Sequence, residues 1–149
     1  MNKQLSDIYN CNVVELPKIH NVAGNITIIQ NGVTQPFNVR RVYYLYDVPG
    51  GSDRGGHAHK NLEQLIIAAS GSFEVVLDDG TNKKVIELNR PYYALYVKPG
   101  IWREIINFSS GAICLVLASE KFDPHDYLRN YQEFIMFRNE RKINPNNNF

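Results

Sequence analysis

The residues best suited to chemistry in this chain are His57 and His59, within the segment Arg54-Gly55-Gly56-His57-Ala58-His59-Lys60. Alternate side chains of a β-strand point to one face, so this spacing predicts two imidazoles on the same side, about 6–7 Å apart. The glycines permit a tight turn that brings the strand to the mouth of a cavity, and Arg54 adds a fixed positive charge. The segment therefore predicts either a metal site or an acid–base pair.

The elements that must position this pair are short β-strands. Turn residues such as Asn31-Gly32 and Pro99-Gly100 recur every several positions. Between the turns lie runs of β-branched and aromatic residues, which predict strands over 25–29, 39–46, 64–69, 73–77, 84–88, 93–97, 104–108 and 112–118. Many short strands with regular turns are typical of a sandwich or barrel. Only 126–141 shows the periodicity of a helix.

Length and composition limit the possible functions. The 149 residues predict one domain over 1–141, followed by a frayed tail over 142–149. Sixteen Lys and Arg against fifteen Asp and Glu give a net charge of +1, which indicates no nucleic-acid partner. No run is apolar enough to span a membrane or to act as a signal peptide. Cys11 and Cys114 lie in unlike contexts, so we expect no disulfide and a cytoplasmic location.

The spacing of glycines and histidines matches a particular barrel. Gly51, His57, His59 and Gly71 fit the first half of the pattern of the double-stranded β-helix, or cupin jelly roll. We therefore expect an all-β cupin barrel with a short C-terminal helix. Its usual metal ligands are incomplete, because Gln64 stands at the acidic position. In the second half, anchored by Pro99, Glu104 replaces the expected histidine and has Arg103 beside it. An amide is a weak ligand for a divalent ion, and a guanidinium repels one.

Six ordered segments resemble the sugar nucleotide 3,4-ketoisomerases that act on dTDP-4-oxo-6-deoxy-glucose, cupins related to the deoxysugar epimerases. The similarity runs from about residue 36 to residue 135. Its segments are Pro36-Phe37-Asn38-Val39-Arg40-Arg41-Val42-Tyr43-Tyr44, Arg54-Gly55-Gly56-His57-Ala58-His59-Lys60, Leu62-Glu63-Gln64, Val97-Lys98-Pro99-Gly100-Ile101-Trp102-Arg103-Glu104, Val116-Leu117-Ala118-Ser119 and Asp126-Tyr127-Leu128-Arg129-Asn130-Tyr131. The resemblance implies an enzyme of surface-polysaccharide and deoxyaminosugar biosynthesis that uses no metal or other cofactor.

The resemblance also implies roles for particular residues. A base must remove the C3 proton next to the C4 ketone and a proton must return to C4, which suits histidine because its pKa lies near neutrality. His57 is the expected base, His59 its partner, and Tyr43 a hydroxyl donor. The expected substrate-binding residues are Arg41 and Arg54 for the diphosphate, Gln64 as a wall residue, Trp102 as a stacking platform, and Arg103 and Glu104 at the cavity-facing end of the second motif.

Several alternatives stay open. His57, His59 and Glu104 together form a possible metal set for a metal-dependent cupin. A non-catalytic module that binds nucleotide sugars is the alternative from another class. Trp102 is nearly as well explained as a core aromatic, and Glu104 as a structural partner of a nearby side chain.

Three further expectations concern configuration, association and the remaining histidines. Arg103, where family members vary between Arg and His, favours the gluco configuration at C4 of the product. Strand-rich cupins of this size commonly pair through sheet edges, so we expect a homodimer in which the segment before Pro36 crosses to the partner. His20 and His125 lack chemical neighbours in the sequence, and we expect them at the surface.

Overall fold

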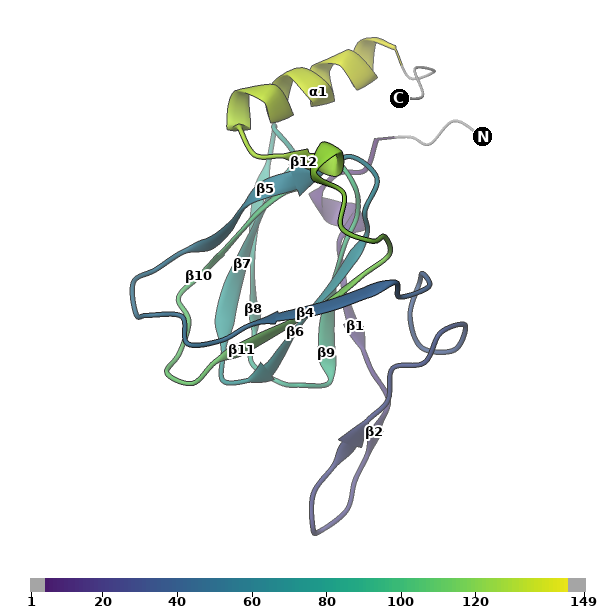
Figure 1. Cartoon of the computed structure of the whole chain (residues 1–149), viewed down its shortest axis with the longest axis vertical. Helices are drawn as coiled ribbons and strands as arrows, with labels where there is room; N and C mark the ends of the chain where they lie inside the picture. Colours follow the sequence, from purple (N-terminus) through teal and green to yellow (C-terminus); the bar gives the residue numbers. More distant parts are fainter. Residues whose placement is uncertain (1–4, 145–149) are drawn as a thin grey trace.

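Two five-stranded β-sheets face each other and form a barrel with one helix at its end (Figure 1). The computed structural model describes residues 5–144. The strands are β1 (Val13–Glu15), β2 (Lys18–Ile19), β3 (Ile26–Thr27), β4 (Arg41–Leu45), β5 (Arg54–His59), β6 (Gln64–Ser70), β7 (Phe73–Asp78), β8 (Lys83–Leu88), β9 (Tyr93–Val97), β10 (Trp102–Ile106), β11 (Ile113–Ala118) and β12 (Tyr127–Leu128). The helical elements are the 3-10 turns Ile8–Asn10 and Pro124–Asp126 and the helix α1 (Tyr131–Ile143).

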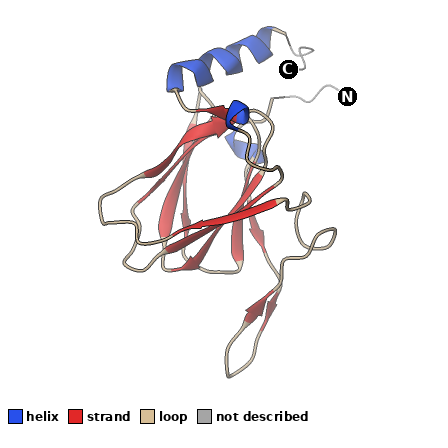
Figure 2. Ribbon diagram, in the orientation of Figure 1, coloured by secondary structure: helices blue, strands red, loops and turns tan. Residues whose placement is uncertain are grey.

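The strand order is that of a jelly roll. One sheet runs β1-β9-β6-β11-β4 and the other β12-β5-β10-β7-β8, and strands β2 and β3 form a separate hairpin. All pairings are antiparallel, and most neighbours in a sheet are distant in the sequence. Figure 2 shows that strands make up most of the regular structure. The predicted all-β cupin fold with a short C-terminal helix is confirmed.

The main core lies between the two sheets, where the inward-facing positions of alternating strands meet. Its buried members are Ile8, Cys11, Ile66, Ala68, Phe73, Val75, Leu77, Leu88, Leu95, Val97, Ile101, Ile105, Cys114 and Val116. Side chains that alternate in and out along each strand produce this layer, as the period of two in the sequence predicts. The space between the sheets is therefore filled largely by apolar side chains.

The C-terminal helix begins later than predicted. Asn130 caps it, because the Asn130 side chain accepts hydrogen bonds from the backbone N–H groups of Gln132 and Glu133. The preceding residues, predicted as the first helical turn, instead form a 3-10 turn and strand β12, which pairs with β5. The helix continues to Ile143, two residues beyond the predicted end. The rest of the predicted tail, 145–149, lies outside the described residues.

Strand β10 also differs from the prediction, because it covers Trp102–Ile106 and not 104–108. It starts directly after the turn at Pro99-Gly100 and ends before Asn107, whose backbone is in the left-handed region with φ of 54°. The earlier start puts Trp102, Arg103 and Glu104 of the second motif on a strand. Between residues 5 and 144, no helix is long and apolar enough to cross a membrane.

Candidate active site

Strand β5 delivers the two histidines through a β-bulge. Arg54 pairs with Ile105 and His57 with Arg103 on β10, so two glycines on β5 oppose one residue on its partner. Gly55 has φ of 98°, and a Cβ built on it would meet the Arg103 carbonyl oxygen at 3.4 Å. The glycines therefore form a bulge within strand β5. The sequence predicts a turn before the strand instead.

His57 and His59 lie on one face of β5, as predicted, and their rings converge. The two Nε2 atoms are 3.1 Å apart, and the rings meet edge to face with centroids 4.8 Å apart. His59 is fully buried, whereas His57 is half-buried and lines the pocket. His57 is consequently the histidine of this pair that a bound molecule can reach.

A buried carboxylate lies behind His59. Asp126 Oδ2 is 3.0 Å from His59 Nδ1, and the same carboxylate accepts hydrogen bonds from the backbone N–H groups of Asn61 and Leu62. Asp126 lies in the 3-10 turn before β12, whose pairing with β5 brings the carboxylate to His59. The three side chains form a line from the pocket into the protein: His57, His59, Asp126.

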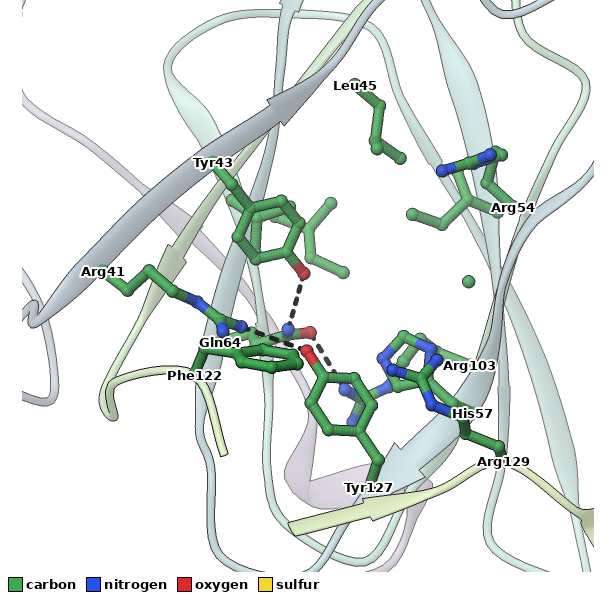
Figure 3. A pocket seen from close by; sticks show the side chains of 14 residues that line it. Arg41, Tyr43, Leu45, Arg54, His57, Gln64, Arg103, Phe122, Tyr127 and Arg129 are labelled. Atoms are coloured by element: carbon green, nitrogen blue, oxygen red, sulfur yellow. Dashed lines mark hydrogen bonds between the residues drawn. The ribbon is translucent and has the colours of Figure 1, made fainter. Parts of the chain in front are cut away.

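A second line of polar side chains connects the two sheets, from Arg103 on β10 to Gln64 on β6 and Tyr43 on β4. Arg103 Nη1 donates to Gln64 Oε1 at 2.9 Å, and Gln64 Nε2 donates to the Tyr43 hydroxyl at 3.0 Å (Figure 3). Gln64 Nε2 is also 3.5 Å from His59 Nε2. Because the Tyr43 oxygen accepts from Gln64, its O–H is free to donate to a bound molecule. The predicted residues Tyr43, Gln64 and Arg103 are thus brought together with the histidines.

These side chains surround a pocket of about 390 Å³ between the sheets. The pocket is lined by Arg41, Tyr43, Leu45, Arg54, Gly55, His57, Gln64, Ile66, Arg103, Ile105, Val116, Phe122, Tyr127 and Arg129. Four of these residues are arginines, and none of the lining residues in the described part of the chain is acidic. Such a pocket favours an anion, because each guanidinium can donate two parallel hydrogen bonds to phosphate or carboxylate.

Burial and the arginines keep both histidines neutral. Burial, followed by the positive charge of Arg103, lowers the pKa of His57 to about 2. Burial also lowers the pKa of His59 to about 4, although the hydrogen bond to Asp126 opposes this shift. Burial would raise the pKa of Asp126, but hydrogen bonds from His59 and the backbone outweigh it and hold that pKa below its ordinary value. The pair is therefore neutral and the carboxylate charged near pH 7.

Trp102 and Glu104 do not reach the pocket, which corrects the prediction that they line it. They point to the opposite face of β10 from Arg103, since side chains alternate along a strand. Trp102 packs under α1 against Phe134, with ring centroids 5.6 Å apart, and its Nε1 donates to Glu104 at 3.1 Å. The structure agrees with the alternatives in which Trp102 is a core aromatic and Glu104 is a structural partner of a nearby side chain.

The structure brings four residues to the site for which the sequence indicated no role: Phe122, Asp126, Tyr127 and Arg129. Their signal was a period of two over 126–129, in which the buried Asp126 and Leu128 alternate with two pocket residues. A helical reading of this short stretch hid that alternation. His20 and His125 are exposed and lie away from the pocket, as predicted.

The alternative metal set is not assembled. Glu104 is exposed on the outer face of the sheet, whereas the histidines face inward. Within the described range, no group of three His, Cys, Asp or Glu residues is arranged so that it could hold a metal ion. The metal ligands that the sequence suggested for a metal-dependent cupin, His57, His59 and Glu104, therefore lie on opposite faces of the sheet.

Comparisons with known proteins agree with this architecture. The family model FdtA, described as WxcM-like, C-terminal, matches residues 9–139. A TDP-4-oxo-6-deoxy-alpha-D-glucose-3,4-oxoisomerase from Aneurinibacillus thermoaerophilus is 42% identical over 122 residues, which are 82% of this chain and 88% of the relative. Together with the barrel and the paired histidines, these matches define the class: cupin-type sugar isomerases.

Two solved structures extend the comparison. QdtA, a sugar 3,4-ketoisomerase from Thermoanaerobacterium thermosaccharolyticum in complex with TDP, is 38% identical with a TM-score of 0.88, and the match covers 91% of this chain and 98% of QdtA. The TDP-quinovose 3,4-ketoisomerase WlaRB from Campylobacter jejuni is 46% identical with a TM-score of 0.81, and the match covers 85% of this chain and 98% of WlaRB. This chain belongs to the FdtA-like family of sugar 3,4-ketoisomerases.

Proposed function

We propose that this protein converts dTDP-4-oxo-6-deoxy-glucose into a dTDP-3-oxo-6-deoxy-hexose by moving protons between C3 and C4. One observation carries the proposal: a pocket lined with arginines exposes one neutral histidine, which is backed by a second histidine and a carboxylate. The names of the relatives support the substrate. QdtA, for instance, was also solved as a histidine-to-asparagine mutant in complex with TDP-4-keto-6-deoxyglucose.

The reaction is a tautomerisation with His57 as the base. His57 takes the C3 proton, the electrons of the C3–H bond form a C3=C4 double bond, and negative charge develops on O4. The O3 hydroxyl proton then moves to O4, C4 takes up a proton, and the ketone is left at C3. The Tyr43 hydroxyl is well suited to stabilise the enediolate oxygen, because burial raises its pKa and keeps it protonated as a donor.

The diphosphate is the part of the substrate that the arginines fit. Arg54 is exposed at the edge of the pocket, and Arg41 is half-buried with Nη2 donating to Tyr127 at 3.2 Å. Nε of Arg41 is buried with no hydrogen-bond partner among the described residues. A diphosphate oxygen would satisfy such a donor, so we assign both arginines to the nucleotide diphosphate.

We propose that the reaction needs no metal. His57 as a neutral base and Tyr43 as a hydroxyl donor are enough for the proton transfers. Glu104, the third ligand of the alternative metal set, lies outside the pocket. Purified protein should therefore isomerise the substrate in the presence of a chelator. Activity that EDTA abolishes and a transition metal restores would contradict this mechanism.

The alternative of a non-catalytic module is tested directly by NMR. Incubation with dTDP-4-oxo-6-deoxy-glucose in D₂O should exchange the C3 proton and yield sugar-ring signals of a 3-oxo product. Binding of the nucleotide sugar without exchange or new ring signals would identify a binding module and refute the enzyme.

For the product we propose the gluco configuration at C4. Arg103 is buried at the inner end of the pocket, where it contacts Gln64. The relative named for TDP-quinovose, a gluco sugar, is 46% identical, against 34% for the TDP-fucose-3,4-ketoisomerase WlaRA, named for a galacto sugar. The coupling of H4 to H5 in the product distinguishes them, because these protons are both axial only in the gluco sugar.

A homodimer remains our proposal for the assembly. The β2–β3 hairpin stands away from the barrel, at the end opposite α1 (Figure 1), and its Ile19, Val22 and Ile26 are exposed. The edge strand β4 presents Val42 and Tyr44 to solvent. Apolar exposure on a projecting segment and on a sheet edge favours pairing with a second copy. Light scattering should give twice the mass of the chain, and a monomer at micromolar concentration would contradict the proposal.

The cytoplasm remains the expected compartment, where glutathione keeps thiols reduced. Cys11 and Cys114 are both unpaired and buried, in keeping with that environment. There the product would enter the synthesis of deoxyaminosugars for surface polysaccharides. Cell fractionation, with the protein followed by antibody, tests the location.

A further inference from the structure

The hydrogen-bond network of the site ends in two charges of opposite sign. At one end lies Arg103, which can only donate hydrogen bonds, and at the other lies Asp126, which as a carboxylate can only accept them. Both are buried, with 1% and 8% of their surface exposed. Between them lie Gln64 and His59, and His57 contacts His59 from the pocket; the donor and acceptor atoms of these side chains follow from their partners.

Arg103 determines the orientation of Gln64. Because the guanidinium donates to it at 2.9 Å, the atom of Gln64 that faces Arg103 must be the carbonyl oxygen. The amide nitrogen then points the other way, toward Tyr43 and toward His59 Nε2. An amide N–H can only donate, so Nε2 of His59 must present a lone pair.

Asp126 leads to the same conclusion from the other side. Its carboxylate is charged, because the backbone N–H groups of Asn61 and Leu62 both donate to it. His59 Nδ1 must therefore carry the proton that bridges the 3.0 Å to Asp126. A neutral imidazole protonated at Nδ1 has its lone pair at Nε2, in agreement with the orientation of Gln64.

The next link in the network is then determined. His57 Nε2 lies 3.1 Å from the lone pair of His59 Nε2, so it must be the donor and carry the proton. We propose that Asp126 is a positioning residue that holds His59 as its Nδ1–H tautomer and His57 as its Nε2–H tautomer, which makes Nδ1 of His57 the basic atom. This inference rests on the proposed isomerase function.

The arrangement also provides a place for the proton between the two half-reactions. As the C3–H bond breaks, its proton bonds to Nδ1 of His57 and the electron pair enters the enediolate. The Nε2 proton of His57 then moves to Nε2 of His59, whose positive charge faces Asp126. The O3 hydroxyl proton moves to O4. The Nε2 proton returns as Nδ1 of His57 protonates C4, so every atom and charge is restored.

The tautomers are measurable in the wild-type protein without any reaction. Long-range ¹H–¹⁵N correlation spectra at about pH 7 distinguish protonated from unprotonated ring nitrogens of each neutral histidine. We expect His59 protonated at Nδ1 and His57 at Nε2, with single-histidine variants supplying the assignments. A spectrum in which His57 carries its proton at Nδ1 would overturn the proposal.

Asp126→Asn should reverse the direction of the hydrogen bonds from residue 126 through His59 to His57, because asparagine has nearly the same shape as aspartate but can donate. Its oxygen can still accept from the Asn61 N–H, while its NH₂ turns to His59 Nδ1 and forces the proton to Nε2, at the loss of the longer hydrogen bond from the Leu62 N–H. His57 then becomes the Nδ1–H tautomer and loses its basic atom. We expect kcat to fall by about 10²–10⁴-fold, with KM within about threefold of the wild-type value and both tautomers inverted in the spectra.

Ser119→Ala is the matched control. The Ser119 hydroxyl accepts from the Glu63 N–H at 2.8 Å, so its removal perturbs the segment after β5 without touching either histidine. We expect this variant to keep the wild-type tautomers and kcat. Equal losses of kcat in the two variants would show that Asp126 has only a structural role and would overturn the proposal. Inverted tautomers in Asp126→Asn together with a near-normal kcat would overturn it as well.

The outcomes separate this inference from the proposed function. If Asp126→Asn does not fold, the wild-type spectra still decide the assignment. Predicted tautomers in a protein that never isomerises the nucleotide sugar would refute the isomerase and with it the role of Asp126. Opposite tautomers in an active isomerase would refute only the role of Asp126.

Discussion

Both the inner end of the pocket and its mouth contain arginines, but the polar side chains of the two regions differ in burial and in their hydrogen bonds. At the inner end, His59, Gln64, Arg103 and Asp126 are 8% exposed or less and bond mainly to one another. At the mouth, Arg54 and Arg129 are exposed, and neither forms an ion pair among the described residues. The polar groups at the inner end are thus held in place by hydrogen bonds, whereas the arginines at the mouth are available to bind a ligand.

This contrast separates catalysis from binding. Groups that are fixed and shielded from water stabilise a transition state without rearrangement, so changes there should lower kcat. Exposed cations contact the diphosphate in the ground state and the transition state alike, so changes there should raise KM. Variants of the two regions should therefore fail in different kinetic parameters.

The largest effect is expected from His57→Asn. Asparagine keeps a polar side chain of similar reach but cannot take up a proton near neutrality, so kcat should fall by about 10²–10⁴-fold. Substrate affinity should hardly change. Steady-state kinetics together with C3 proton exchange in D₂O measure both quantities. Near-normal turnover and exchange would remove His57 as the base and make His59 the leading candidate.

A large effect is also expected on stability at low pH. Because burial lowers the pKa of His57 to about 2 and that of His59 to about 4, the unfolded chain binds protons below about pH 6.5 that the folded protein does not. The free energy of unfolding should be at its full value above pH 6.5 and fall as the pH is lowered from there. The contribution of His59 alone reaches about 3 kcal/mol near pH 4.

Urea unfolding at a series of pH values between 7 and 4.5 measures this loss. Near neutrality the charges that face the two histidines are Arg41, Arg103, Arg129 and Asp126. The pKa of Asp126 is held below its ordinary value, so this carboxylate stays charged through the whole range. Replacing both His57 and His59 with Gln should flatten the dependence, whereas His20→Gln, at an exposed site, should leave it unchanged. An unaltered slope in the double variant would show that other groups cause the loss.

At the mouth, Arg54→Ala should raise KM by about tenfold and leave kcat nearly unchanged, because it removes one charge-assisted hydrogen bond at an exposed site. Arg40→Ala is the matched control. Arg40 is 61% exposed, pairs with Glu120 and does not line the pocket. A loss of kcat in Arg54→Ala, with KM retained, would break the proposed division between mouth and inner end.

The smallest effect is expected from Glu104→Gln. The side chain lies on the outer face of β10 and accepts from Trp102, and glutamine keeps an oxygen for that contact. Both kcat and KM should stay within about twofold of wild type, since nothing that touches the substrate changes. A large loss of activity, rescued by added metal, would restore the metal-dependent alternative.

Local patterns accounted for much of what the sequence predicted correctly. The alternation of side chains and the turn residues located most of the strands, and the His-x-His spacing put both imidazoles on one face. The glycines before them indicated a special backbone, although it is a bulge and not a turn. Each of these features depends on residues a few positions apart, where the chain itself limits the geometry.

Tertiary structure alone decided which face of each strand meets the pocket and which distant residues meet the histidines. Trp102 and Glu104 were expected in the pocket, but on β10 the alternate residues Arg103 and Ile105 are the ones that point inward. The carboxylate behind His59 comes from Asp126, 67 residues along the chain, through a two-residue strand too short to have a clear sequence pattern. The sequence determined the strand-rich barrel and the histidine pair because neighbouring residues dictate both. The direction of the hydrogen bonds through that pair depends on the charges of Arg103, on strand β10, and Asp126, in a 3-10 turn, which only folding brings together.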